Sequence, residues 1–398
     1  MELSKYEQQM YGGEFGEAIQ QSMEILVALG KIYKAENFIP VSSSQIAGVS
    51  YKTIGDAGLE YLEDMVKNNA KVKIPSYLNP AGMDITNWKD MKIPEDFAEK
   101  QLKIIELYSK MGIKTTCTCT PYLIGIRPKL KEHIAWSESS AVSFANSVLG
   151  ARTNREGGPS ALASAICGIT PNYGLHLDEN RISEILISVE ADLKDSSDFG
   201  AMGYYLGNAV KGKIPSFIKI SSASEDKLKA LGAAMAATGS VPLYYVKNIT
   251  PEFILSDSPE KITFEERELK EIKEKLNSET ENLKPELIAI GCPHSSLDEI
   301  KEISEFLKGK KLLCDLWVCT SRNISEQAYK LKYTEIIEKA GGKIVCDSCM
   351  VVCPIEEIGY GITGVNSGKA AKYLPGFNKP RIIFKSIKEL LSDYTEDV

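Results

Sequence analysis

Apolar residues in the N-terminal part of the chain recur at helical spacing, and short apolar runs separate these stretches. Within residues 14–33, Ile19, Met23, Leu26 and Gly30 fall on one face because they stand three or four positions apart, a spacing typical of an amphipathic helix. The same reasoning predicts further helices over residues 53–66 and 95–111. Apolar runs predict strands over residues 38–49 (with a loop at 47–50), 71–77 and 113–118.

The next part of the chain continues this alternation. We predict strands over residues 185–189, 216–220 and 243–246, and helices over 199–210, 223–237 and 264–275. Gly200, Gly203 and Gly207 lie within the first of these helices. Glycine has no Cβ and lets backbones approach closely, so these positions predict tight packing against another element.

Residues 277–284 are polar and form the best candidate linker, which suggests two regions, 1–284 and 285–398. Beyond the linker we predict strands over residues 287–291, 311–317, 343–346 and 381–384, alternating with helices over 297–307, 325–340 and 367–373. Alternating strands and helices indicate an α/β fold of several layers with mainly parallel sheets. Ligands of such sheets bind at the carboxyl ends of the strands.

Composition narrows the class of protein. The chain has 398 residues, of which 43% are hydrophobic, and a formal net charge of -7. No apolar run is long enough to span a bilayer, and Met1 is not followed by a secretion leader, so we expect a cytoplasmic protein with no membrane partner. Nucleic acid is an unfavourable partner because binding phosphate backbones needs a basic surface. An anionic small molecule needs only a few local cations and stays a candidate.

Nine cysteines are many for such a chain, and they are grouped rather than dispersed. Cys119, Cys292 and the group from Cys346 to Cys353 each follow a predicted strand, so a single cleft can collect them. Three thiolates from separate loops can hold an iron–sulfur cluster with one iron left open. One alternative is a zinc site that includes Cys346 and Cys349, and another is a Cys292 nucleophile paired with His294. In a third, several of the cysteines serve only as small buried hydrophobic residues.

The stretch from Trp136 to Arg181 is rich in polar residues and glycine. Arg152 and Arg155 stand there beside a predicted helix that Ser160 can cap, and guanidinium groups near a helix N-terminus suit an anion. A polar loop with structural salt bridges is the alternative. Gly48, Val49 and Ser50 precede another helix, where their N–H groups can bind a phosphate or form an ordinary cap.

Longer motifs carry a resemblance to a known family. These are Trp136-Ser-Glu-Ser-Ser140, the run from Asn146 to Ser160, Tyr173 to Arg181, Gly291-Cys-Pro-His-Ser-Ser296, Asp347-Ser-Cys-Met-Val-Val352 and Asn366-Ser-Gly-Lys-Ala-Ala371. Together they resemble the aconitase X family, a branch of the aconitase superfamily of iron–sulfur hydro-lyases. The resemblance implies an aconitase-like fold and the dehydration of (R)-5-phosphomevalonate in a modified mevalonate pathway to isoprenoids. The dehydration of cis-3-hydroxy-L-proline is the alternative activity, and a metal-binding scaffold subunit is the non-enzymatic one.

The resemblance also implies which residues form the site. The metal ligands would be Cys119, Cys292 and Cys349, holding a [4Fe-4S] cluster with one open iron, although three thiolates also suit fewer irons. Neither Cys117 nor Cys353 is required by the family pattern. The implied substrate contacts are Gly48, Val49, Ser50, Asn79, Pro80, Glu138, Ser139 and Lys369, and Glu138 and Ser139 are the candidate catalytic residues. We add Arg152, Arg155 and Arg322 because arginine binds anions through paired hydrogen bonds.

The family further implies a separate small subunit. The chain ends shortly after its last predicted strand and is expected to lack the swivelling domain of longer relatives. That domain, on the small subunit, would supply a serine as the base. Within this chain, His294 is more suited to supporting the metal ligands than to serving as the base.

Overall fold

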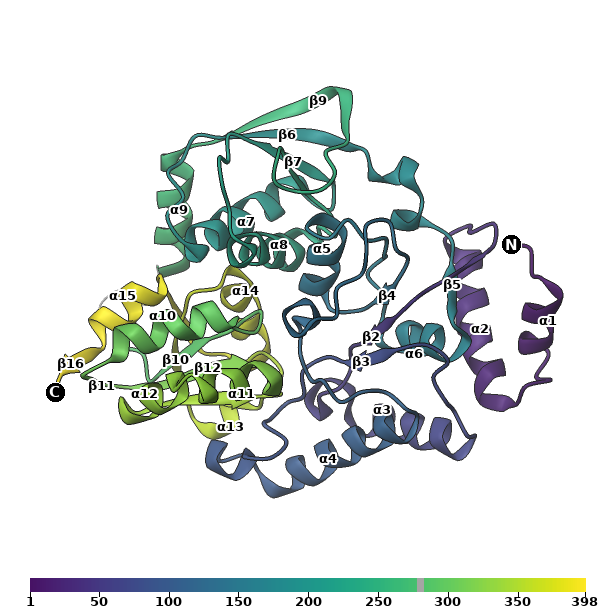
Figure 1. Cartoon of the computed structure of the whole chain (residues 1–398), viewed down its shortest axis with the longest axis horizontal. Coiled ribbons are helices and arrows are strands. Elements are labelled where there is room, and N and C mark those ends of the chain that lie inside the picture. The colour runs from purple at the N-terminus through teal and green to yellow at the C-terminus, as the bar shows by residue number, and fades with distance from the viewer. Residues whose placement is uncertain (278–282) are drawn as a thin grey trace.

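The computed structural model describes residues 1–277 and 283–398, and its elements form three groups around separate sheets (Figure 1). The first group contains a three-stranded parallel sheet in which β2 lies between β3 and β4. β1 and β5 form a small antiparallel pair beside it. The strands are β1 Phe38–Pro40, β2 Ser44–Ile46, β3 Ser76–Leu78, β4 Ala135–Trp136 and β5 Ile169–Pro171.

Helices surround this first sheet and bury a core of their own. α2 packs on α6, α3 packs on α4, and α6 contacts β2. The helices are α1 Lys5–Tyr11, α2 Glu17–Ile32, α3 Tyr51–Lys67, α4 Glu95–Lys110, α5 Ser139–Ser147 and α6 Gly158–Cys167. Short 3-10 turns lie at η1 Trp88–Met91, η2 Pro121–Ile124, η3 Gly174–His176 and η4 Asp178–Arg181.

The second group is a four-stranded parallel sheet of order β8-β7-β6-β9. Its elements are β6 Ser183–Val189, α7 Ser196–Val210, β7 Pro215–Ile218, α8 Glu225–Gly239, β8 Tyr245–Val246, β9 Leu255–Phe264 and α9 Glu266–Asn277. α7 and α8 pack so closely that a Cβ on Gly203 would lie 2.6 Å from the carbonyl oxygen of Leu231. The close packing predicted from the glycines is confirmed.

The third group is a five-stranded parallel sheet of order β13-β12-β10-β14-β15. Its strands are β10 Leu287–Ile290, β12 Asp315–Thr320, β13 Gly342–Cys346, β14 Ile362–Val365 and β15 Arg381–Phe384. Its helices are α10 Leu297–Leu307, α11 Arg322–Lys330, α12 Tyr333–Lys339, α13 Ile355–Ile358, α14 Gly368–Asn378 and α15 Ile387–Asp393. β11 Lys310–Leu312 and β16 Thr395–Asp397 pair at the edge.

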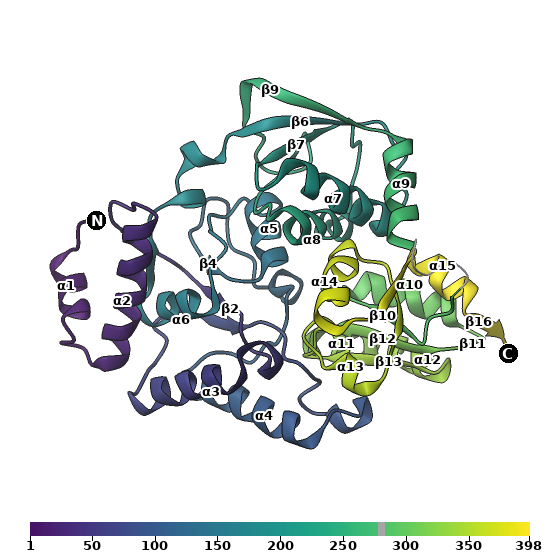
Figure 2. The same cartoon turned by 180° about the vertical axis from the view of Figure 1, so that it is seen from behind.

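Both views place the second group above the other two, with the first and third groups side by side below it (Figures 1 and 2). One large hydrophobic core runs through the second and third groups and includes residues of the loops before α4. Helix α14 belongs to the third sheet but contacts α7 and α8 of the second. The predicted α/β architecture with mainly parallel sheets is confirmed.

Several local predictions differ from the structure. Residues 113–118 form a loop, with only an isolated bridge between Lys114 and Tyr77. The predicted strand 311–317 is divided into β11 and β12, and the helix 325–340 into α11 and α12, because Lys332 between the helices has a positive φ of 63°. The predicted linker lies largely outside the described residues. No helix in the described ranges is long and apolar enough to cross a membrane.

Candidate active site

A cavity of about 440 Å³ opens between the first and third groups of elements, and three cysteines line it. Cys119 lies just before η2, Cys292 follows β10, and Cys349 follows β13. β10 is the strand at which the order of the third sheet reverses, because its neighbours β12 and β14 lie on opposite sides. Such switch points are where open α/β sheets bind ligands. The other six cysteines do not line this cavity.

The turn that presents Cys292 depends on the glycine before it. Gly291 has a φ of 101°, and a Cβ there would stand 2.1 Å from the carbonyl oxygen of Cys319. Only glycine fits such a backbone without displacing the neighbouring strand. Tight approach of the turn to β12 therefore fixes where Cys292 enters the cavity.

The thiols of Cys292 and Cys349 share a hydrogen bond, which is the main reason that the pKa of Cys349 is lowered to about 7. Burial raises the pKa of Cys119 to about 12, although the charge of Lys369 opposes this. Three soft sulfur donors on three independent loops form a suitable ligand set for an iron–sulfur cluster with one iron not bound by protein. The residues present therefore fit the group that the family resemblance implies.

A buried ion pair lines the same cavity as the cysteines. The ammonium of Lys369 contacts the Oε1 carboxylate oxygen of Glu138, and the Asn79 amide donates to Oε2 at 2.8 Å. Burial alone would raise the pKa of Glu138, but Lys369, Asn79 and the more distant charge of Arg155 outweigh it and lower this pKa to about 2. The pKa of Lys369 is raised in spite of its burial, chiefly by Glu138. Both groups are charged at neutral pH.

Helix α8 supports both members of this pair. Glu138 is the N-cap of α5 and Lys369 lies in the first turn of α14, and both helices pack against α8. A Cβ on Gly232 of α8 would stand 2.8 Å from the Ser143 hydroxyl of α5. A Cβ on Gly368 would stand 2.5 Å from the backbone of α7. These glycines allow helices from different sheets to bring Glu138 and Lys369 together.

The remaining wall combines a helix N-terminus with a guanidinium group. Gly48, Val49 and Ser50 lead into α3, and the Ser50 hydroxyl donates to the carbonyl oxygen of Val352 at 2.9 Å. Because Val352 follows Cys349, this bond joins the α3 wall to a cysteine loop. Arg155 also lines the cavity. The other lining residues predicted from the sequence are Asn79, Pro80 and Ser139.

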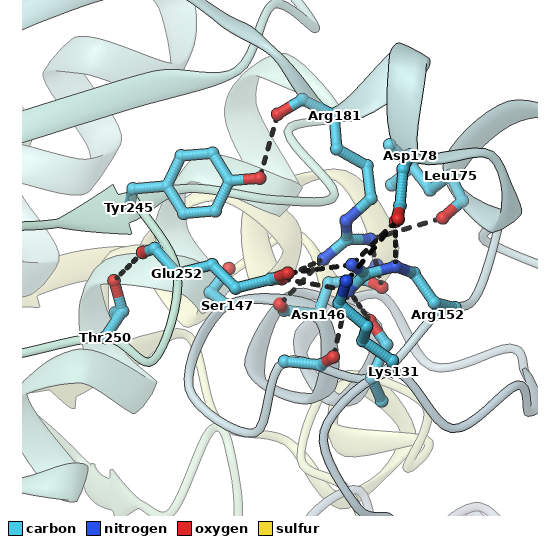
Figure 3. Close-up of polar contacts among 12 residues, drawn as sticks. Lys131, Asn146, Ser147, Arg152, Leu175, Asp178, Arg181, Tyr245, Thr250 and Glu252 are labelled. Atoms are coloured by element: carbon cyan, nitrogen blue, oxygen red, sulfur yellow. Dashed lines mark hydrogen bonds and ion pairs between the residues drawn. The ribbon is translucent and has the colours of Figure 1, made fainter. Parts of the chain in front are cut away.

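Two predicted substrate residues lie elsewhere, and the expectation for them is corrected. Arg152 is almost fully buried, and its guanidinium bonds Glu252 at 2.8 Å and Asp178 at 2.7 Å (Figure 3). Arg322 pairs with Asp84 at 2.9 Å and also with Asp347. Neither side chain lines the cavity. The structure supports the alternative for Arg152, a structural salt bridge.

Apolar residues on α14 complete the cavity and were not predicted as part of the site. Tyr373 and Phe377 line it together with Lys369. Positions 369, 373 and 377 are each four residues apart, so they share one face of the helix. This spacing is a signal in the sequence that points from the lysine to both aromatic residues. Ile54, Val351 and Val352 add further apolar surface.

Comparisons with known proteins identify the family of the chain. Models of the first, second and third aconitase X domains match residues 1–179, 183–274 and 285–396. A phosphomevalonate dehydratase large subunit of Methanothermobacter thermautotrophicus is 55% identical over 94% of both chains. A cis-3-hydroxy-L-proline dehydratase of Pseudomonas aeruginosa is 31% identical over 97% of this chain and 68% of its own length.

A solved structure gives the same result for the fold. The crystal structure of Thermococcus kodakaraensis aconitase X, in its holo-form, is 48% identical, with a TM-score of 0.93 over 99% of this chain and 100% of its own. The similarity in sequence and in structure thus extends along nearly the whole chain. The chain belongs to the aconitase X family.

Proposed function

We propose that this chain is the large subunit of a phosphomevalonate dehydratase. It would remove water from (R)-5-phosphomevalonate to give trans-anhydromevalonate 5-phosphate, a step of a modified mevalonate pathway to isoprenoids. Four relatives that are 49–55% identical are named as this large subunit. The structural observation that carries the proposal is that three cysteines share one cavity with Glu138, Lys369 and Arg155.

Cys119, Cys292 and Cys349 are the proposed cluster ligands, since membership of the aconitase superfamily implies an iron–sulfur cluster. A cluster with an open iron supplies a Lewis acid that assists departure of a hydroxyl group. Cys346 does not line the cavity, and its thiol bonds Ser325 instead. The donor set therefore supports a cluster over a zinc site built on Cys346 and Cys349.

The polar wall suits an anionic substrate. Lys369 and Arg155 supply positive charge, and the N-terminus of α3 supplies backbone N–H groups and the favourable end of the helix dipole. Gly48, Val49 and Ser50 at that terminus would take the phosphate or the carboxylate. Phosphomevalonate carries a phosphate and a carboxylate, whereas hydroxyproline carries a carboxylate alone. The several cationic and N–H groups of this wall therefore favour phosphomevalonate.

Glu138 and Ser139 are proposed to orient the substrate hydroxyl. A carboxylate whose pKa is about 2 accepts hydrogen bonds well but is a weak base at neutral pH. The Ser139 hydroxyl donates to Glu138 at 3.3 Å, which holds the two groups side by side. We therefore propose that the proton is removed by a group outside this chain.

The partner is proposed to be a small subunit that covers the cavity and brings a serine base. The names of the closely similar relatives as large subunits support a partner of this kind. A cover over the cavity would exclude water from the reacting groups. The apolar rim of Tyr373 and Phe377, of which Phe377 is 46% exposed, offers a surface for such a cover.

The test is turnover of the anaerobically reconstituted chain, with and without the small subunit. Phosphomevalonate should be dehydrated in the presence of both chains, and omission of the small subunit should lower the rate about 100-fold or more, the contribution of a positioned base. Equal rates with and without the small subunit would indicate that Glu138 or Ser139 is the base. Turnover of cis-3-hydroxy-L-proline alone would favour that activity, and zinc without iron or sulfide would favour a scaffold.

A further inference from the structure

His294 lies at the point where all three cysteine loops come together. It is two residues beyond Cys292, and its side chain is fully buried. Its backbone N–H donates to the Sγ atom of Cys119 at 3.2 Å. His294 therefore belongs to the Cys292 loop and contacts the Cys119 loop through the sulfur atom of Cys119.

The imidazole extends these contacts to both other loops. Nε2 lies 2.8 Å from the carbonyl oxygen of Ser348, the residue before Cys349. Nδ1 lies 3.0 Å from the hydroxyl of Thr118, the residue before Cys119. A carbonyl oxygen can only accept, so Nε2 carries the hydrogen and the ring orientation is fixed by its two partners.

The backbone of His294 is held from the opposite side. Lys229 of α8 donates to the carbonyl oxygen of His294 at 3.3 Å and is itself paired with Glu299 at 2.6 Å. Thr118 is also held, because the backbone N–H of Thr120 donates to its hydroxyl at 3.1 Å. The backbone that carries the imidazole and one of the two partners of the ring are therefore both held in place.

We infer that His294 is the positioning residue that sets the spacing of Cys119, Cys292 and Cys349, an inference that rests on the proposed function. Removal of the imidazole leaves the three loops without their common hydrogen-bonded centre. The thiols would then reach the cluster from less constrained positions and release it faster. His294 itself neither binds the substrate nor moves a proton in this role.

The experiment measures how fast an iron chelator removes iron from reconstituted protein without oxygen, followed by loss of visible absorption. His294→Leu removes both ring bonds. Thr118→Val removes the ring bond at Nδ1 but not the one at Nε2, and it also removes the contacts of the Thr118 hydroxyl with Thr120. His294→Gln keeps an N–H donor for Ser348. His176→Leu is the matched control, because His176 is also a buried, hydrogen-bonded histidine but lines a different cavity. The thermal midpoint of each apoprotein is recorded alongside.

We expect His294→Leu to release iron about 10- to 100-fold faster than the wild type, the usual effect of removing groups that orient metal ligands. Thr118→Val should show a smaller increase, His294→Gln should fall between wild type and His294→Leu, and His176→Leu should match the wild type. Equal release from wild type and His294→Leu, or equal acceleration by His176→Leu, would overturn the inference. If His294→Leu does not fold, unchanged release from Thr118→Val overturns it. A wild type that takes up no iron would instead overturn the proposed function.

Discussion

Arg152 and Arg155 are three residues apart in one polar loop, yet they have different surroundings. Arg152 points inward, where Glu252 also pairs with Arg181 at 3.3 Å, so two buried guanidinium groups share one carboxylate (Figure 3). Arg155 is exposed and lines the cavity. Residue type and motif alone did not separate them, because the carboxylate of Glu252 comes from a loop about 100 residues further along the chain.

This contrast leads to paired predictions for Arg152→Met and Arg155→Met. Arg152→Met leaves Glu252 and Arg181 incompletely paired in the interior, and we expect it to lower the free energy of unfolding by about 3–5 kcal/mol. Arg155→Met should leave stability nearly unchanged and lower kcat/KM for phosphomevalonate about 10- to 100-fold, the effect of losing a charge-assisted hydrogen bond. Urea unfolding and steady-state kinetics measure the two effects. The reverse pattern would mean that Arg152 is the substrate contact.

His176 makes the stability of the chain depend on pH. Burial, with smaller contributions from His133 and two arginines, lowers the pKa of His176 to about 3. The unfolded chain binds a proton near pH 6.5 and the folded chain does not, so stability that is fully present above pH 6.5 is lost as the pH falls below it. Between pH 7 and 5.5 the wild-type apoprotein should lose about 1 kcal/mol more than His176→Gln. Parallel urea titrations at the two pH values measure this difference, and equal losses would contradict it.

At the scale of elements, the sequence predicted the alternation of strands and helices. It also predicted that each cavity cysteine follows a strand, which holds for Cys292 and Cys349, whereas Cys119 follows the loop 113–118. Helix 297–307 and strand 381–384 were predicted with the bounds that the structure has. The helix has apolar residues at helical spacing and the N-cap Ser296, and the strand is a short apolar run. Residues 113–118 were misread because their apolar pattern resembles a strand, whereas their backbone is bonded to β3 at only a few points.

The elements that were missed are those whose environment is supplied by distant parts of the chain. α5 is buried on every side, so it shows no polar face and no helical alternation for a pattern to reveal. β4 has two residues and exists because β2 pairs with it. The place of Arg322 was equally unpredictable, since its partners Asp84 and Asp347 come from two separate loops.

At the scale of the whole molecule, the site depends on all three groups of elements. The first group contributes Cys119 and Glu138, and the third contributes Cys292, Cys349 and Lys369. The second group lines none of the cavity but supplies α8, against which α5 and α14 pack. The division into regions 1–284 and 285–398 stays a prediction, and this cavity lies between the two.

Iron and sulfide content of single cysteine variants is the most direct test of this account. Cys119→Ser, Cys292→Ser and Cys349→Ser should each lose most of the iron and sulfide that the reconstituted wild type binds. The matched controls are Cys346→Ser and Cys353→Ser, whose thiols lie close by in the chain but do not line the cavity, and these should keep nearly all of it. Full iron retention in Cys292→Ser, or loss in Cys353→Ser alone, would contradict a cluster held by the three cavity cysteines.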